Sequence, residues 1–189
     1  MTIIAGSNGS GKSTLTKGAR EEFQQASLLD PDAVAKSIRE TLPEAGSDIK
    51  AGKRVLRLAD ELLTKRQSFT VETTLSGSTY LRMAAEAKAV GFDLTVIFVG
   101  TTAVEINIQR VRARVEKGGH DVPEEDQRRR WPRTLANMQK LLPMADLAVL
   151  LDNSGSNGYV LVAFGNKASM HWRETLPKWA VALRNSISQ

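Results

Sequence analysis

A glycine-rich stretch near the start of the chain constrains its fold more than any other feature. Residues Gly6–Ser13 read Gly-Ser-Asn-Gly-Ser-Gly-Lys-Ser and match the pattern G-x-x-x-x-G-K-[ST] at every position. A short apolar segment, Thr2–Ala5, comes directly before the stretch, and a segment of helical character, from about Lys12 to Gln25, comes directly after it. A strand, a glycine-rich turn and a helix in this order form a P-loop, so we expect the chain to begin as an α/β fold.

The chemistry of a P-loop follows from its backbone. Glycines let the chain turn tightly, so that successive N–H groups point inward, and the N-terminus of the helix adds partial positive charge. We expect Lys12 to reach the β- and γ-phosphates of ATP and the hydroxyl of Ser13 to coordinate the Mg²⁺ ion that bridges them. The residues expected to bind ATP are Gly6, Ser7, Asn8, Gly9, Ser10, Gly11, Lys12, Ser13 and Thr14. The alternative, a chance turn that caps a helix, is disfavoured by the intact flanking pattern.

Strand-like and helix-like segments alternate along the rest of the chain. The further strands are expected at Ser27–Leu29, Phe69–Glu72, Leu94–Val99, Leu147–Leu151 and Tyr159–Phe164. The further helices are expected from Asp30 to before Pro43, at Ile49–Leu63, Leu81–Val90, Val104–Val115 and Glu124–Leu142, and in a closing helix with Trp172 and Trp179. This alternation predicts a three-layer α/β P-loop fold of the nucleotide-kinase type, with a mostly parallel sheet, helices on both faces and an antiparallel pair at one edge. The length of 189 residues fits a single domain, 1–189.

Composition narrows the class of protein. The chain has no cysteine, which excludes disulfides and thiolate metal sites. No signal-like start and no apolar run of membrane length is present, so we expect a cytoplasmic protein without a membrane partner. Lysine and arginine outnumber aspartate and glutamate by 26 to 21, and seven arginines lie between Arg110 and Arg133. This local excess predicts an anionic partner.

Acidic residues at strand ends are the candidates for handling an acceptor. Asp30-Pro31-Asp32 follows the second expected strand, and Asp32 is the candidate base that takes the proton of a hydroxyl acceptor. Asp30 fits equally a place in the water shell of Mg²⁺ or the N-cap of a helix with proline at its first position. Glu72 and Thr73 end the third strand and are candidate substrate-binding residues; a helix-capping or surface acid is the alternative for Glu72.

The arginine-rich segment suggests a lid at about residues 110–133. The pair Gly118-Gly119 separates two arginine-bearing helices and could act as a hinge, which would bring guanidinium groups onto the phosphates and exclude water. Arg110, Arg114, Arg129 and Arg130 are the candidate catalytic arginines. His120 is a candidate substrate contact, although a histidine between glycine and aspartate is more often a turn residue. The plain alternative for the arginines is solvation or pairing with neighbouring acids.

These motifs together resemble the zeta-toxin-like P-loop kinases, in particular their small stand-alone bacterial members. The resemblance rests on the P-loop, Asp30-Pro31-Asp32, Thr70–Thr74, the string Gly118-Gly119-His120-Asp121-Val122-Pro123 and the following Arg128-Arg129-Arg130. It implies an adenylate-kinase-like fold, with ATP and Mg²⁺ bound by Lys12 and Ser13, and Asp32 at the position of the family's base. It also implies lid arginines, Arg110 among them, as phosphate clamps. The implied acceptor is a hydroxyl of the sugar in UDP-N-acetylglucosamine, and an antitoxin-like protein is a candidate partner, although small members of the family often lack an evident antitoxin.

Two other functions fit parts of the sequence. A P-loop ATPase without a small-molecule acceptor would use Asp152 as its metal-binding acid, but Asn153 stands where its hydrolytic glutamate should follow. A nucleic-acid kinase or binder would use the arginine-rich segment, but aromatic residues make up only 5% of the chain and offer little surface for base stacking. We therefore rank a small-molecule kinase first and disfavour nucleic acid as the partner.

Overall fold

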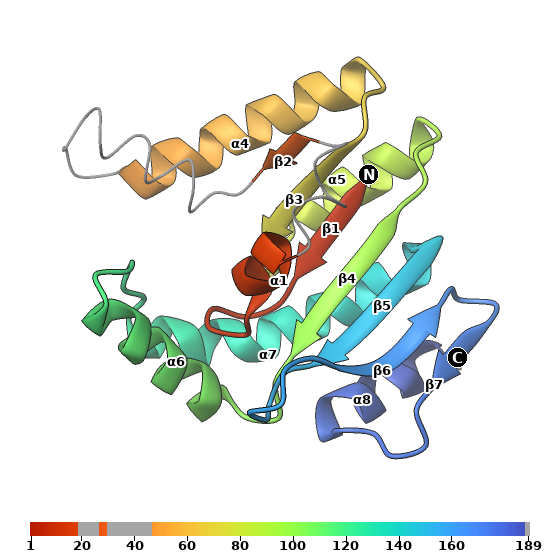
Figure 1. Ribbon diagram of the computed structural model, residues 1–189. Helices are drawn as coiled ribbons and strands as arrows, with labels where there is room; N and C mark the ends of the chain where they lie inside the picture. The colour runs from red at the N-terminus through yellow and green to blue at the C-terminus, as the bar shows by residue number, and fades with distance from the viewer. Residues whose placement is uncertain (19–26, 30–46, 188–189) are drawn as a thin grey trace.

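A seven-stranded sheet forms the centre of the computed structural model, which describes residues 1–18, 27–29 and 47–187 (Figure 1). Its strands are β1 (Thr2–Ala5), β2 (Ser27–Leu29), β3 (Phe69–Thr73), β4 (Thr95–Gly100), β5 (Leu147–Asp152), β6 (Val160–Gly165) and β7 (Met170–Trp172). Their order across the sheet is β2-β3-β1-β4-β5-β6-β7. The first five strands in that order are parallel, and β6 and β7 are added antiparallel. The predicted mostly parallel sheet is confirmed.

Helices lie on both faces of this sheet (Figure 1). They are α1 (Lys12–Gly18), α4 (Ser47–Thr64), α5 (Thr79–Ala89), α6 (Val104–Glu116), α7 (Glu124–Leu141) with the short 3₁₀ turn η1 (Leu142–Met144), and α8 (Lys178–Ile187). Helix α1 lies on one face, and α4, α5, α7 and α8 contribute to the apolar core on the other. The three-layer α/β architecture expected from the sequence is therefore present.

The main core forms where alternate residues of the parallel strands meet these helices. Ile3, Val71, Phe98 and Leu150 are each at most 1% exposed and belong to this core. Side chains alternate between the two faces of a strand, and a parallel sheet buries both faces, which explains why these strands are apolar almost throughout. Trp179 of α8 closes the core at its far end, with its ring 5.3 Å from that of Phe98 and edge-on to it.

The end of the chain differs from the expectation. The predicted closing helix begins only at Lys178, so Trp179 lies in it, but Trp172 lies in β7 together with His171. An Asx turn accounts for the extra strand, because Asn166 Oδ1 accepts hydrogen bonds from the backbone N–H groups of Ala168 and Ser169 and returns the chain alongside β6. The expected continuation of the first helix to Gln25, and the expected helix from Asp30 to Pro43, lie outside the described residues.

The parallel strands bring several loops to one edge of the sheet. The P-loop follows β1, a short loop follows β3, α6 follows β4, and the loop 153–159 follows β5. Because ligands of open α/β sheets bind beyond the carboxyl ends of the strands, this edge is the place to look for a site. Among the described residues, no helix combines the length and apolar character that a membrane crossing requires.

Candidate functional site

The P-loop forms a cradle that only glycine fits at two positions in particular. Gly9 has φ 74° and Gly11 has φ 109°, a backbone region that side chains disfavour. A Cβ atom added at Gly9 would lie 2.4 Å from the carbonyl oxygen of Asn107, and one added at Gly11 would lie 2.4 Å from Nδ2 of Asn153. The loop is therefore packed tightly from outside, and its N–H groups at Gly6 and Ser10 donate to the carbonyl oxygens of Thr73 and Ser7. This geometry fits the phosphates of a nucleotide.

Lys12 lies at the start of α1, where a phosphate-binding lysine is expected. Its side chain is buried, and Nζ donates a hydrogen bond of 3.2 Å to the carbonyl oxygen of Ser7. The ammonium group is therefore folded back over the loop that would hold the phosphates. Its role in catalysis stays a prediction, and its position agrees with that role.

Glu72 forms a partly buried hydrogen-bonded pair with Ser13. The hydroxyl of Ser13 donates to Glu72 Oε1 over 2.6 Å, and Thr16 donates to Oε2 over 3.3 Å. Glu72 is only 5% exposed, and its backbone is in register with Ile4 of β1, which places it directly beside the P-loop strand. A serine hydroxyl has one proton and two lone pairs, so donating the proton to Glu72 leaves the lone pairs for a cation. The donor set therefore fits Mg²⁺ at Ser13.

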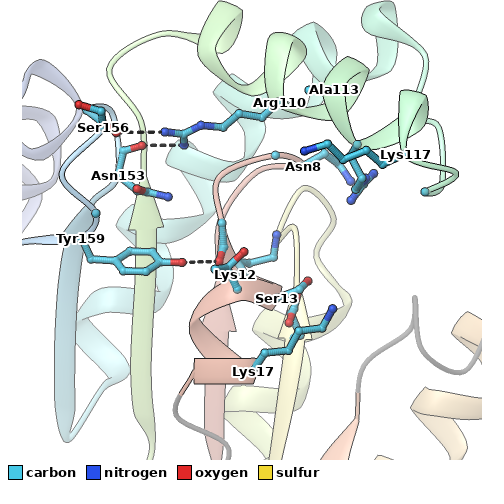
Figure 2. A pocket seen from close by; sticks show the side chains of 18 residues that line it. Asn8, Lys12, Ser13, Lys17, Arg110, Ala113, Lys117, Asn153, Ser156 and Tyr159 are labelled. Atoms are coloured by element: carbon cyan, nitrogen blue, oxygen red, sulfur yellow. Dashed lines mark hydrogen bonds between the residues drawn. The ribbon is translucent and has the colours of Figure 1, made fainter.

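A cavity of about 740 Å³ lies over the P-loop (Figure 2). It is bounded by the P-loop and the start of α1, by one side of α6, and by the loop 153–159. Basic side chains line it: Lys12 and Lys17 from α1, and Arg110 and Arg114 from α6, with Lys117 just after the end of α6. A hollow of this size with several cationic groups suits a nucleotide triphosphate.

Arg110 and Arg114 both line this cavity, and each is held by backbone carbonyl groups. Arg110 donates from Nη1 to the carbonyl of Asn153 over 2.7 Å and from Nη2 to that of Gly155 over 3.4 Å. Arg114 donates from Nη2 to the carbonyl of His120 over 2.7 Å. The side chain of His120 was predicted to contact substrate, and that role remains a prediction.

The glycine pair after α6 ends this helix. Gly118 has φ 80°, and its N–H donates to the carbonyl of Val115 over 2.8 Å; the N–H of Gly119 donates to Arg114 over 2.9 Å. A Cβ atom at Gly119 would lie 2.5 Å from Cγ of Arg114. The pair follows the C-cap residue Lys117 and forms a Schellman motif, which also gives the Arg114 side chain room to turn back across it. Its predicted use as a hinge is untested.

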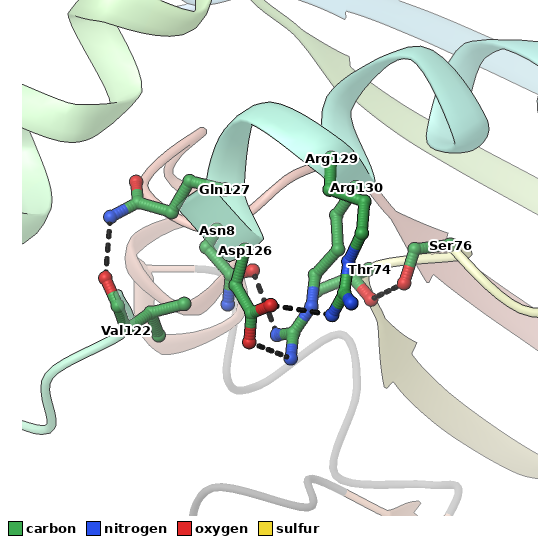
Figure 3. A network of polar contacts seen from close by, with 8 residues as sticks. All are labelled: Asn8, Thr74, Ser76, Val122, Asp126, Gln127, Arg129 and Arg130. Atoms are coloured by element: carbon green, nitrogen blue, oxygen red, sulfur yellow. Dashed lines mark hydrogen bonds and ion pairs between the residues drawn. The ribbon is translucent and has the colours of Figure 1, made fainter. Parts of the chain in front are cut away.

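Arg129 and Arg130 lie at the start of α7, and both pair with Asp126 (Figure 3). Arg130 Nη2 lies 3.0 Å from Asp126 Oδ2, and its Nη1 lies 3.5 Å from Oδ1 of Asn8 in the P-loop. Arg129 is exposed. Of the two predicted arginines on α7, Arg130 is thus the one in contact with the P-loop.

The remaining predicted residues have different surroundings. Thr73 is buried, and its hydroxyl accepts a hydrogen bond of 2.9 Å from the N–H of Leu75, which fixes the turn after β3. Leu75 itself is fully buried at φ 55°, a rare conformation for leucine. Asp30 and Asp32 lie outside the described residues.

Sequence reasoning missed two residues that contact the P-loop from the far end of the chain. Asn153 donates from Nδ2 to the carbonyl of Ser10 over 2.8 Å, and Tyr159 donates its hydroxyl to the carbonyl of Gly11 over 2.7 Å. Burial raises the pKa of Tyr159, which keeps this hydroxyl protonated as a donor. The only signal in the sequence is that Asn153 follows directly after an apolar strand, where ligand-facing residues gather.

Comparisons with known proteins identify the family of the chain. The family model described as Zeta toxin matches residues 1–157 of the chain. A curated relative, an uncharacterized protein of Haemophilus influenzae, is 35% identical over 123 residues, which cover 65% of this chain and 86% of the relative. The resemblance inferred from the P-loop and the lid string is confirmed.

Solved structures share the fold at low sequence identity. A chain of the AvrRxo1-ORF1:AvrRxo1-ORF2 complex with sulphate ions aligns with a TM-score of 0.74 and 14% identity, over 98% of this chain and 62% of that chain. The same complex has been solved with ATP. The PezAT chromosomal toxin–antitoxin system of Streptococcus pneumoniae aligns with a TM-score of 0.62 and 17% identity, over 96% and 75% of the two chains. This chain thus spans less than two thirds of the matched AvrRxo1 chain.

Proposed function

The chain belongs to the zeta toxin family, and from this membership and the geometry of its P-loop we propose that it is an ATP-dependent phosphotransferase acting on a hydroxyl group of a small molecule. The observation that carries the proposal is the arrangement of Lys12, Ser13 and Glu72 in the lining of the cavity. It offers a phosphate-binding cation and a hydroxyl oriented for Mg²⁺ in one place. Both are parts that phosphoryl transfer from ATP requires.

The proposed reaction assigns one task to each group. ATP supplies the γ-phosphoryl group, and Mg²⁺, held through Ser13, would offset the charge of the phosphate oxygens. Lys12 binds the β- and γ-phosphates, so that charge developing on them is stabilised by a positioned ammonium group. The oxygen of the acceptor hydroxyl bonds to the γ-phosphorus, and the bond from the γ-phosphorus to the ADP oxygen breaks. Asp32 accepts the proton that the hydroxyl loses. Asp30 is proposed for the water shell of Mg²⁺.

The lid segment, about residues 110–133, is proposed to supply the remaining positive charge. Arg110 and Arg114 already line the cavity, and Arg130 contacts the P-loop through Asn8. Closure over ATP would exchange the carbonyl and Asp126 contacts of these side chains for phosphate oxygens, which arginine binds in bidentate geometry. Exclusion of water by the closed lid would favour transfer to the acceptor over hydrolysis.

A nucleic-acid partner is less well supported than a small molecule. Four arginines of the segment are engaged with neighbouring acids: Arg112 with Glu124, Arg128 with Glu105, and Arg129 and Arg130 with Asp126. A basic surface for nucleic acid would present such groups unpaired to phosphates. These pairs therefore support the alternative that part of the arginine cluster serves only to pair with neighbouring acids.

The Glu72→Gln variant tests the orientation of Ser13. The Glu72 carboxylate accepts the hydrogen bond of the Ser13 hydroxyl and adds negative charge beside the cation. We therefore expect the rate of phosphoryl transfer to fall by about tenfold to a hundredfold in the variant. The Mg²⁺ concentration for half-maximal rate should rise, as measured by a titration of initial rates. Glu86→Gln, at an exposed position on α5, is the matched control and should match the wild type. An unchanged Mg²⁺ dependence with a higher KM for the acceptor would return Glu72 to a substrate-binding role.

Replacing Arg130 tests the lid. Since its guanidinium group is beside the P-loop, Arg130→Ala should lower kcat by about a hundredfold, the usual cost of losing one donor that stabilises transition-state charge. Arg128→Ala removes an exposed arginine, paired with Glu105, from the same turn and should change kcat less than twofold. Steady-state kinetics of the two variants decide the point. Equal losses in both would mean that the helix contributes only general positive charge.

UDP-N-acetylglucosamine is the proposed acceptor, through a hydroxyl of its sugar. Purified protein should be incubated with ATP and Mg²⁺ together with UDP-N-acetylglucosamine or, as the matched control, UDP without the sugar. Mass spectrometry should find a product heavier by one phosphoryl group only from the sugar nucleotide. A product heavier by one phosphoryl group from UDP as well would move the acceptor from the sugar to the uridine diphosphate part. No product from either would exclude this substrate while leaving other hydroxyl acceptors to be tried.

A protein partner of the antitoxin kind and a cytoplasmic location belong to the same proposal. The AvrRxo1 and PezAT structures named above are of complexes or of a toxin–antitoxin system, which supports a partner for a protein of this fold. ATP and nucleotide sugars are cytoplasmic substrates, which supports the location. Copurification of a small protein encoded next to this one, with loss of kinase activity, would test the partner.

A further inference from the structure

The loop after β5 contacts one side of the P-loop, and its residues Asn153 and Tyr159 also line the cavity over the P-loop (Figure 2). Asn153 Nδ2 donates to the carbonyl of Ser10 over 2.8 Å, and Tyr159 donates to that of Gly11 over 2.7 Å. The fit is close, because a Cβ atom at Gly11 would lie 2.4 Å from Asn153 Nδ2 and 3.1 Å from the Tyr159 hydroxyl. The side chains of Asn153 and Tyr159 thus hold the Ser10–Gly11 and Gly11–Lys12 peptide groups.

These contacts set the direction of the phosphate-binding N–H groups. In a trans peptide the C=O and N–H bonds point in opposite directions. Holding the carbonyl of Ser10 outward therefore turns the N–H of Gly11 inward, and holding the carbonyl of Gly11 turns the N–H of Lys12 inward. Inward N–H groups are the ones that bind phosphate oxygens in a P-loop.

The loop that carries Asn153 is itself fixed from several sides. The N–H of Asn153 donates to the carbonyl of Gly100 in β4 over 2.9 Å, and its carbonyl accepts from Arg110 of α6. Asp152 Oδ1 accepts from Trp179 Nε1 of α8 over 2.8 Å. Because strand β4 and the closing helix α8 hold this loop even when lid closure releases the Arg110 contact, it can act as a rigid support.

We propose that Asn153, with Tyr159 in a lesser part, is a positioning residue for the triphosphate: it holds the P-loop peptide so that its N–H groups face the phosphates. Tyr159 has the smaller role because the carbonyl of Gly11 also accepts from the N–H groups of Thr14 and Leu15. The inference rests on ATP binding in the proposed function and adds two residues to it. Neither residue needs to touch the ligand.

Binding of inorganic tripolyphosphate separates an effect on the phosphate site from a contact with the nucleoside. This probe carries the phosphates of ATP without a base or ribose. Calorimetric Kd values for ATP and tripolyphosphate with Mg²⁺, and no acceptor, should be compared for the wild type, Asn153→Ala, Tyr159→Phe and the control Asn157→Ala. Asn157 is exposed in the same loop and does not line the cavity. Because Asn153→Ala loses one hydrogen bond, it should raise the Kd values for ATP and tripolyphosphate by the same factor, roughly threefold to tenfold. Tyr159→Phe should weaken both by about twofold, and Asn157→Ala neither.

The outcomes against the proposal are distinct. If Asn153→Ala binds ATP more weakly but tripolyphosphate with unchanged Kd, Asn153 contacts the nucleoside directly. If both Kd values are unchanged and Tm is lower, the role of Asn153 is purely structural. If Asn153→Ala does not fold, Tyr159→Phe, which removes one hydroxyl, must still weaken both ligands. A wild type that binds ATP without competition from tripolyphosphate would overturn this inference alone. A wild type that binds neither would contradict the proposed function itself.

Discussion

Replacing Lys12 by alanine should reduce phosphoryl transfer by about 10³-fold while the protein stays folded. Among the lysines that the structure describes, Lys12 is the buried one. Its side chain turns back over the P-loop, where Nζ lies 3.2 Å from the carbonyl oxygen of Ser7. In the wild type, the Lys12 ammonium group would bind the β- and γ-phosphates. In the variant, water would take its place and cannot supply a positioned cation. Its removal should therefore act on the transition state more than on the core. Initial rates with saturating ATP, next to a thermal melt, measure both effects.

The control for this variant is Lys65→Ala, which removes an exposed lysine just after α4. It should match the wild type in rate and in Tm. A Lys12→Ala protein that melts at the wild-type temperature and transfers phosphate at the wild-type rate would contradict the assignment of the P-loop.

Asp32→Asn should retain ATP binding and lose phosphoryl transfer by about 10²- to 10⁴-fold, the usual contribution of a general base. The described strand β2 ends at Leu29, whose register partner is Val71, one residue before Glu72. The chain therefore leaves β2 at the same edge of the sheet at which Glu72 and Ser13 meet. Asparagine keeps the shape of the side chain and cannot take the proton.

Two measurements read this variant. The Kd for ATP, from titration without acceptor, should change less than threefold, whereas kcat in the presence of acceptor should collapse. Asp60→Asn, at an exposed site on α4, is the matched control. Loss of ATP binding by Asp32→Asn would place Asp32 with the metal instead, and full activity would remove it from the site.

Local patterns made much of the fold and part of the site predictable. The P-loop depends on eight consecutive residues, and its strand and helix follow from the residues on either side. Helices α6 and α7 have bounds within one residue of the predicted ones, because the Gly118-Gly119 pair ends α6 and the acidic run Glu124–Asp126 begins α7. The pairing of Asp126 with Arg129 and Arg130 was also visible in principle, since residues three and four apart share one helix face.

The contacts that complete the site depend on pairings that no local pattern contains. Asn153 and Tyr159 meet the P-loop across 143 and 148 residues of chain. Glu72 reaches Ser13 across 59 residues, and only the parallel register of β1 with β3 brings them together. The short strand β7 was missed for a different reason: three residues carry too little periodicity to tell a strand from a helix.

The most direct test of the account follows the γ-phosphoryl group of ATP. The purified protein should be mixed with Mg²⁺, ATP and a pool of small metabolites free of protein and nucleic acid, and the products should be followed by ³¹P NMR. The account predicts that ATP is consumed while a new phosphomonoester appears, and that neither change occurs with Lys12→Ala. Release of inorganic phosphate alone, at the same rate with and without the metabolites, would show an ATPase and contradict the proposed transfer to a hydroxyl group.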